Sequence, residues 1–239
     1  MPAPLITGSL RPVPDRPYTL LSCAVSIDGY LDDASVDRLI LSGPEDLDEV
    51  DELRAAADAI LVGAGTIRAD NPRLLVRDAA RSARREAAGR ASHPLRVTLT
   101  ATGDLDPAAR FFTGPGTPLV YCARAAVPAA RNSLLDKAVI IDAGAELSLR
   151  GVLKDLHAER TVATVLIEGG SQILRAALAD DLADELRLAI APFFVGDPAA
   201  PRFALPASYP HTVAKPMTLL SVRRVGEAAI LRYRPAAPK

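Results

Sequence analysis

Residues 164–179 read TVLIEGGSQILRAALA, a stretch that joins a strand pattern, a glycine turn and a helix pattern. The run Thr164–Ile167 is short, apolar and rich in β-branched residues, which is typical of a strand. The glycine pair at 169–170 permits a sharp turn. Apolar residues then recur at spacings of three and four, which predicts a helix over Ser171–Ala179.

The same alternation of short apolar runs and helical patterns occurs along the rest of the chain. Further strands are predicted at 18–28, 59–64, 95–101, 118–122, 138–141 and 185–192, helices after Ser42 and over 149–156, and a terminal antiparallel hairpin over 217–225 and 228–234. Strands that alternate with helices indicate an α/β fold with a mostly parallel sheet. No second core, linker or repeat is visible. We therefore expect one domain over 18–239, preceded by a proline-rich extended arm over 1–17.

Composition narrows the class of protein. Of the 239 residues, 49% are hydrophobic, and the mean hydropathy is +0.15, so the chain can bury a large core. The formal net charge of −1 gives no general attraction to nucleic acid or to an anionic membrane. Residues 77–93 are rich in arginine and alanine but lack interleaved aromatic residues, and we predict that most of this segment is a solvated surface helix or loop.

Cysteine and histidine usage bears on compartment and metal binding. Cys23 and Cys122 are the only cysteines, and both lie in apolar stretches. We expect them to be buried small hydrophobic residues of a protein from a reducing compartment, the cytoplasm. Two cysteines and three scattered histidines offer no zinc-binding spacing, so we expect no metal and no zinc-dependent deaminase module in this sequence.

Ligands of open α/β sheets bind beyond the carboxyl ends of the parallel strands, so the residues that leave each strand are candidates for the site. At 62–72 the sequence is VGAGTIRADNP, where Gly63 and Gly65 allow a close approach to the backbone. The stretch lacks the third glycine and the downstream acid of the Rossmann fingerprint, and that assignment is rejected. A packed strand followed by an ordinary turn is the alternative.

At 165–171 a strand runs through Glu168 and the glycine pair 169–170 directly into a helix. Backbone N–H groups at such a helix start form an anion site that suits a dinucleotide pyrophosphate. We interpret Glu168 as an acceptor for substrate hydroxyls or a ring N–H, because a carboxylate does not favour a phosphate. Its alternative role is to satisfy the helix N-terminus.

The third candidate region is residues 26–30, where a strand ends in an Asp-Gly turn. This turn could pass over a flat ring of a ligand, and the alternative is an ordinary turn without a binding role. Two arginines, Arg54 and Arg77, flank the 59–77 region. Guanidinium groups bind phosphomonoesters well, although single arginines are more often surface charges.

Four segments together resemble the reductase domain of bacterial riboflavin biosynthesis, and especially its stand-alone pyrimidine reductase relatives. They are SIDG at 26–29, SGPED at 42–46, LRAAADAILVGAGTIRADNPRLLVR at 53–77 and LIEGG at 166–170. The resemblance runs in order across residues 18–234. It implies a dihydrofolate reductase-like fold, a single three-layer domain whose mainly parallel sheet of about eight or nine strands ends in an antiparallel hairpin.

The resemblance also implies roles for single positions. Cofactor contacts are expected at Thr66, Asp70, Gly169, Gly170 and Ser171, and substrate contacts at Arg54, Leu74, Arg77 and Glu168. Glu168 and Asp70 are the expected catalytic residues, with Asp70 as a candidate proton donor that would need a raised pKa.

The implied reaction transfers a hydride from NADPH to C1′ of a ribosylamino-pyrimidine 5′-phosphate and gives the ribitylamino product, as in 5-amino-6-(5-phosphoribosylamino)uracil reductases. One alternative within the fold is a reductase of dihydrofolate or another pterin, for which the aromatic content of 4% provides little stacking surface. A different alternative is a non-catalytic NADP(H)-binding regulatory protein. By analogy with relatives, a homodimer is expected.

The chain departs from the family pattern at two positions. Ser22 stands where many relatives have a lysine that contacts substrate, and Tyr30 stands where they often have Lys or Arg. Both departures concern the substrate side of the site and leave the cofactor side unchanged.

Overall fold

In the computed structural model, residues 14–35 and 39–235 are described, so most of the predicted N-terminal arm lies outside the described residues. The contacts group the chain into two compact units. Unit 1 contains residues 51–166 together with the chain up to Tyr18, and unit 2 contains residues 19–50 and 167–239.

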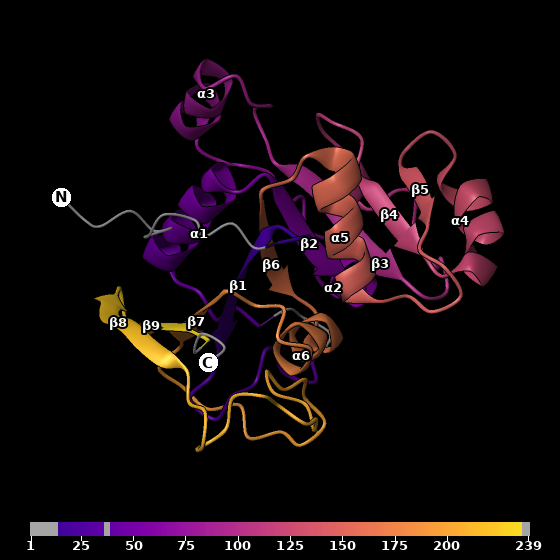
Figure 1. Cartoon of the computed structure of the whole chain (residues 1–239). Coiled ribbons are helices and arrows are strands. Elements are labelled where there is room, and N and C mark those ends of the chain that lie inside the picture. The colour runs from indigo at the N-terminus through magenta and orange to yellow at the C-terminus, as the bar shows by residue number, and fades with distance from the viewer. Residues whose placement is uncertain (1–13, 36–38, 236–239) are drawn as a thin grey trace. The chain divides into compact units, whose positions relative to one another are not determined.

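The described residues form a nine-stranded sheet with the strand order β5-β4-β3-β2-β6-β1-β7-β9-β8 (Figure 1). The strands are β1 (Tyr18–Val25), β2 (Ala59–Gly63), β3 (Leu95–Thr100), β4 (Leu119–Cys122), β5 (Val139–Asp142), β6 (Thr164–Gly169), β7 (Glu185–Ile190), β8 (Thr218–Val225) and β9 (Ala228–Arg234). The helices are α1 (Pro44–Ala56), α2 (Ala64–Asp70), α3 (Ala79–Ala87), α4 (Val127–Leu134), α5 (Leu149–Arg160) and α6 (Ser171–Ala179). The predicted α/β class is confirmed.

Unit 1 is built on the parallel strands β2 to β5. β3 pairs in parallel with both β2 and β4, and β4 pairs with β5. All five residues of β2 are buried, as its uninterrupted apolar sequence predicts. Asp58, just before β2, accepts the backbone N–H groups of Ala163 at 3.1 Å and Thr164 at 2.9 Å, which fixes where β6 begins.

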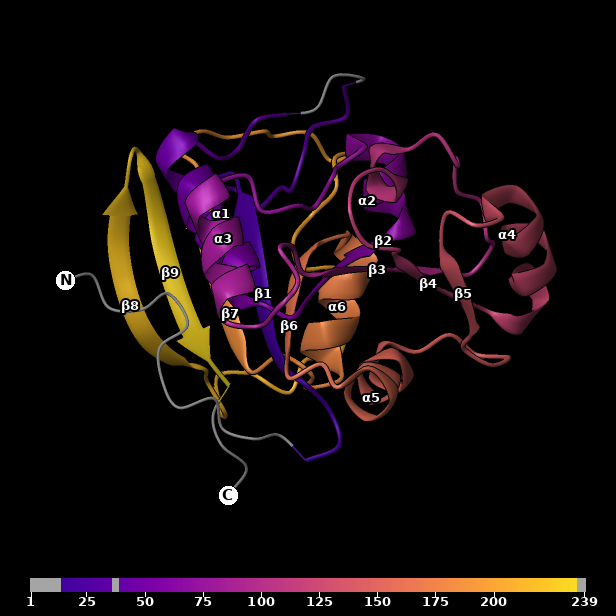
Figure 2. The same ribbon diagram turned by 90° about the horizontal axis from the view of Figure 1, so that it is seen from above.

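Unit 2 contains the parallel pair β1–β7 and the antiparallel strands β7, β9 and β8. The C-terminal hairpin predicted from sequence is confirmed, and Figure 2 shows β8 and β9 side by side with β8 outermost. Ile230 of β9 is fully buried in a small cluster with Ala189 and Ala228.

One face of this antiparallel sheet carries buried charges beneath the first half of α1. The Arg187 guanidinium hydrogen-bonds to Asp46 and, at 3.0 Å, to Glu49. Arg223 of β8 donates twice to the Glu49 carboxylate, at 2.8 and 3.0 Å. These ion pairs attach α1 to strands β7 and β8.

One local prediction from the sequence is corrected, and two others gain detail. Residues 64–70 form the helix α2, where the sequence was interpreted as a strand exit and turn. Helix α1 begins at Pro44, as expected of a helix after Ser42, and the carbonyl of Gly43 accepts the first helical bond from Leu47. Most of residues 77–93 is exposed and includes the helix α3, as predicted, but Arg85 within it is only 5% exposed.

The two cysteines are both buried and free, as expected. Desolvation raises the pKa of the Cys23 thiol to about 12, against a smaller lowering by the charge of Arg187. Cys23 is therefore a neutral packing residue. Among the described residues, no helix combines the length and the apolar character that a membrane span requires.

Candidate functional site

Helix α2 carries two of the predicted cofactor residues. It follows β2 directly, so its residues leave the carboxyl end of a parallel strand. Thr66 and Asp70 are both half-buried on this helix. Asn71 ends it in a left-handed conformation at φ 44°, and its side-chain oxygen accepts the backbone N–H of Arg110 at 2.7 Å.

The segment after α2, residues 71–78, contains two of the predicted substrate residues. Leu74 is 2% exposed and adopts φ 53°, a left-handed conformation that is unusual for a leucine. A buried side chain in a strained backbone position persists only where surrounding contacts enforce it. Leu74 therefore has a packing role, whereas Arg77 extends an exposed side chain from the same segment.

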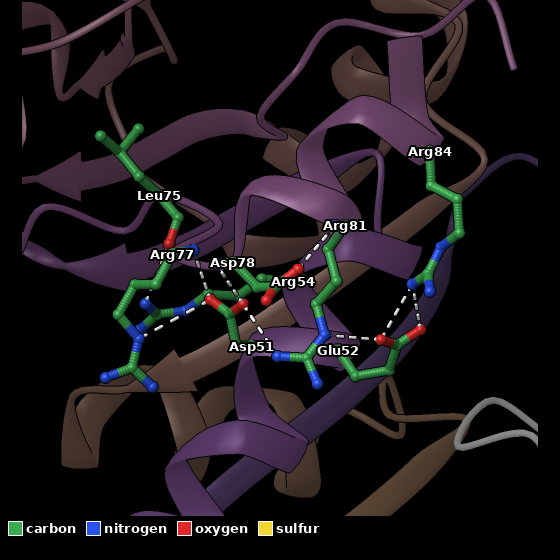
Figure 3. A network of polar contacts seen from close by, with 8 residues as sticks. All are labelled: Asp51, Glu52, Arg54, Leu75, Arg77, Asp78, Arg81 and Arg84. Atoms are coloured by element: carbon green, nitrogen blue, oxygen red, sulfur yellow. Dashed lines mark hydrogen bonds and ion pairs between the residues drawn. The ribbon is translucent and has the colours of Figure 1, made fainter. Parts of the chain in front are cut away.

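Helix α1 holds this segment through charged side chains (Figure 3). Asp51 accepts the backbone N–H groups of Arg77 at 2.6 Å and of Asp78 at 3.0 Å. Its carboxylate also accepts Arg81 Nη1 at 3.1 Å. One helical turn later, Arg54 donates to the carbonyl oxygen of Leu75 at 3.3 Å. The structure thus brings two predicted substrate residues, Arg54 and Arg77, into one network.

The negative charge at the centre of this network is the buried carboxylate of Asp51. Burial alone would raise the pKa of Asp51, but the hydrogen bonds from Arg77, Asp78 and Arg81 outweigh it and hold the pKa below its ordinary value. Asp51 is consequently an anion at neutral pH. The Arg77 side chain is 53% exposed, and its Nε lies 3.7 Å from Asp51.

In unit 2, the predicted residues 168–171 lie where β6 passes into α6. Glu168 is half-buried and is the penultimate residue of β6, and Gly169 is the last. Gly170 adopts φ 91° and ψ 109° as the N-cap, a conformation that favours glycine, and as a glycine it places no side chain of its own over the helix start. Its carbonyl accepts Leu174 N–H at 2.9 Å. The strand–turn–helix unit predicted from sequence is confirmed.

The third strand exit, after β1, is a structural turn in unit 2. The Asp28 carboxylate accepts the N–H groups of Val195 at 3.1 Å and Gly196 at 2.8 Å, so it ties the turn to the segment after β7. Ser22, in the middle of β1, is buried.

A positively charged side chain does lie beside Tyr30, the position at which relatives often have Lys or Arg. The guanidinium of Arg202 sits 4.2 Å from the centroid of the buried Tyr30 ring and also hydrogen-bonds to its hydroxyl. Two residues that shape the candidate regions, Asp51 and Arg202, were missed from the sequence. Their partners lie 26 and 172 residues away along the chain, and neither has a motif that signals its role.

The sequence model of one family, described as the RibD C-terminal domain, matches residues 17–231. A curated 2,5-diamino-6-ribosylamino-4(3H)-pyrimidinone 5′-phosphate reductase from Archaeoglobus fulgidus is 32% identical over 213 residues, covering 89% of this chain and 95% of the relative. A protein of the same name from Methanothermobacter thermautotrophicus is 34% identical over 182 residues, covering 76% and 80%.

Solved structures give the same picture of the fold. RibD of Acinetobacter baumannii has a TM-score of 0.77 at 26% identity, over 93% of this chain and 59% of that longer chain. A pyrimidine reductase-like protein from Corynebacterium diphtheriae has a TM-score of 0.78 at 24% identity, over 93% of both chains, which shows the fold alone. The fold implied by the resemblance is confirmed.

Proposed function

This chain belongs to the RibD C-terminal domain family, and from that membership we propose that it is the NADPH-dependent reductase of a ribosylamino-pyrimidine 5′-phosphate in riboflavin biosynthesis. The observation that carries the proposal is the 32% identity to the Archaeoglobus reductase over nearly the whole of both chains. The reaction converts the ribosylamino group to a ribitylamino group.

The pyrimidine base of the substrate can be the diaminopyrimidinone or its deaminated uracil form. The relative that this chain matches over 95% of its length is named for the 2,5-diamino-pyrimidinone. The RibD of Chlamydia pneumoniae, by contrast, is covered over only 55% of its length. We therefore propose the diaminopyrimidinone, rather than the deaminated uracil, as the preferred substrate.

Support for a dinucleotide cofactor comes from the start of α6. Gly170, at φ 91°, leads from β6 into the helix without a side chain that would obstruct its start, and backbone N–H groups at a helix start stabilise a pyrophosphate. When bound, NADPH supplies the hydride. We propose that Gly169, Gly170 and Ser171 bind it together with Thr66 and Asp70.

Substrate binding is assigned to Arg54, Leu74, Arg77 and Glu168. The exposed guanidinium of Arg77 suits the 5′-phosphate, because Arg binds phosphate through a planar pair of N–H donors. Leu74 contributes through the backbone it shapes. Glu168 accepts hydrogen bonds from the sugar or the base, and with Asp70 it is the candidate for proton handling next to the reacting carbon.

The proposal is tested by following NADPH oxidation with three substrates in parallel: the diaminopyrimidinone phosphate, its deaminated uracil form, and dihydrofolate. We expect turnover of a ribosylamino substrate, with a product that gains two hydrogen atoms by mass spectrometry, and the highest kcat/KM for the diaminopyrimidinone. Turnover of dihydrofolate alone would assign the chain to pterin reduction. Tight NADPH binding without any turnover would leave only the regulatory alternative.

Two variants separate the roles of the residues 168 and 170. Glu168→Ala should lower kcat/KM by about 10- to 100-fold, the value of a hydrogen bond to a charged group, with the Kd for NADPH unchanged. Gly170→Ala should raise the Kd for NADPH and leave the use of the bound substrate unchanged. An L-residue at φ 91° is strained and distorts the first turn of α6. Both constants are measured by steady-state kinetics and by fluorescence titration of NADPH. A loss of NADPH affinity in Glu168→Ala would contradict the assignment of this carboxylate to substrate.

We further propose a homodimer in the cytoplasm. Strand β8 ends the sheet order of the described residues, and it exposes Leu219 at 50% and Val222 at 59%. These residues pair with Tyr233 and Leu231, so all four side chains share one face of the hairpin. A second copy of this chain would cover that face. The two buried free cysteines suit a reducing compartment.

A further inference from the structure

A buried carboxylate in unit 1 has no assigned role in recognition. Asp51 of α1 is 2% exposed, and it contacts the segment that carries Arg77 through backbone and side-chain donors (Figure 3). A buried anion is stable only when its oxygens are well paired, and each Asp51 oxygen accepts a backbone N–H. We infer that Asp51 is a positioning residue, which sets the Arg77 guanidinium for the phosphate of the substrate; this inference rests on the proposed function.

The backbone contacts fix the base of the Arg77 side chain. The N–H groups of Arg77 and Asp78 are consecutive, and they bind different oxygens of the same carboxylate at 2.6 and 3.0 Å. Two hydrogen bonds to one carboxylate orient the two peptide units that flank the Cα atom of Arg77. The Cα–Cβ direction of Arg77 is thereby set by a side chain of α1.

The side-chain ion pair favours one direction of the guanidinium. Nε of Arg77 lies 3.7 Å from Oδ1 of Asp51, and Figure 3 shows the two terminal nitrogens pointing away from this carboxylate. A guanidinium held at Nε presents its terminal N–H pair outward, as bidentate phosphate binding requires. Holding it in advance lowers the conformational entropy lost on binding.

The neighbouring residue Glu52 provides a matched control. It is on the same helix and also binds Arg81, through Nε at 2.7 Å, and Arg84 at 2.7 Å. No hydrogen bond joins Glu52 to Arg77 among the described contacts. Removing its charge perturbs the same pair of helices, α1 and α3, without releasing Arg77.

The first experiment compares Asp51→Asn, Glu52→Gln and Arg77→Ala in steady-state kinetics with the ribosylamino-pyrimidine phosphate. We expect Asp51→Asn to raise KM about tenfold, with kcat changed less than threefold and the Kd for NADPH unchanged. Glu52→Gln should leave KM within about twofold of the parent. Asp51→Asn should add little to KM in an Arg77→Ala background, since the two residues act through one guanidinium. Equal effects of Asp51→Asn with and without Arg77 would overturn the inference and leave Asp51 a purely structural residue.

The second experiment separates this inference from the proposed function. Binding of ribose 5-phosphate is measured by calorimetry for the parent and the same variants. We expect Asp51→Asn and Arg77→Ala each to weaken binding about tenfold, and Glu52→Gln to bind as the parent does. That result together with no turnover of either pyrimidine substrate would reject the proposed function and keep the positioning role. Unchanged binding by Asp51→Asn, or no binding by the parent, would overturn the positioning role itself.

Discussion

At the residue scale, several arginines of unit 1 donate hydrogen bonds to backbone carbonyl groups and are not simply surface charges. Arg85 donates from Nη1 to the carbonyls of Ala55 at 2.8 Å and Ala57 at 2.7 Å, and from Nε to Ala91 at 2.8 Å. The first two carbonyls belong to the end of α1, where a helix leaves acceptors without intrahelical partners. Arg96 likewise donates to Thr113 at 2.6 Å and to Pro115 at 3.1 Å, which organises the loop before β4.

Arg85→Met should therefore destabilise the fold strongly. The substitution keeps the apolar stem but removes the buried guanidinium, so that the carbonyls of Ala55 and Ala57 keep only Arg90 as a donor, at 3.5 and 2.6 Å, and we expect a loss of about 2 kcal/mol in the free energy of unfolding. Arg84→Met is the control, because that side chain is 62% exposed and only its pair with Glu52 is lost, worth below about 1 kcal/mol. Urea denaturation followed by circular dichroism measures both. Similar losses for the two variants would show that burial of Arg85 is not what matters.

At the element scale, the first half of α1 is attached to β7 and β8 by carboxylates that must stay ionised. Burial of Glu49 acts to raise its pKa, but hydrogen bonds from Arg223 and Arg187 outweigh that effect and the pKa lies below its ordinary value. A depressed carboxyl pKa stabilises the fold above the unfolded-state value of about 4.3, and the contribution is lost as pH falls through the folded-state value.

We expect the free energy of unfolding to fall as the pH decreases below about 4. Glu49→Gln should be less stable than the parent at pH 7 and show a flatter dependence over the acid range, so that the two curves converge. Glu159→Gln, an exposed residue on α5, should follow the parent curve. Chemical denaturation at a series of pH values checks this, and parallel curves for Glu49→Gln and the parent would contradict the assigned pKa direction.

Elements with a strong pattern could be predicted from the sequence, and elements defined by distant partners could not. Helix α6 and strand β9 have the predicted bounds, because their periodicity and flanking glycines are local signals. Helix α2 was missed, since it has only seven residues and begins with Ala-Gly-Thr. The burial of Arg85 within the mostly exposed segment 77–93 could not be predicted, because its acceptors lie 28 and 30 residues away.

Part of the candidate site could likewise be predicted from local sequence signals, and part of it could not. The glycine turn and helix start at 169–171 could be interpreted physically from the sequence, whereas the roles of Thr66, Leu74 and Arg77 came from the family resemblance. The left-handed backbone of Leu74 has no signal in its residue type. The role of Asp51 has no signal in its residue type either, because an acidic residue in a helix is ordinarily exposed to solvent.

At the scale of the whole molecule, the proposed homodimer predicts a particle of about twice the chain mass of 25.2 kDa. Light scattering coupled to size exclusion measures it. Val222→Glu should shift the particle towards the mass of one chain, because a charge would be buried in the apolar face of the hairpin. Ala158→Glu, at an exposed position on α5, serves as the control for altered net charge. A monomeric parent protein would reject the homodimer.

The pairing of β1 with β7 also sets the order of events during synthesis on the ribosome. Leu20 is aligned with Glu185, so an early apolar strand meets its neighbour only after 165 further residues have been translated. At roughly 5–20 residues per second, that interval is on the order of 8 to 33 seconds. Throughout it, the nascent chain presents an unpaired strand edge, the type of surface that chaperones bind. Yield of this protein in cells should therefore depend on translation speed and chaperone supply more than its folded stability would indicate.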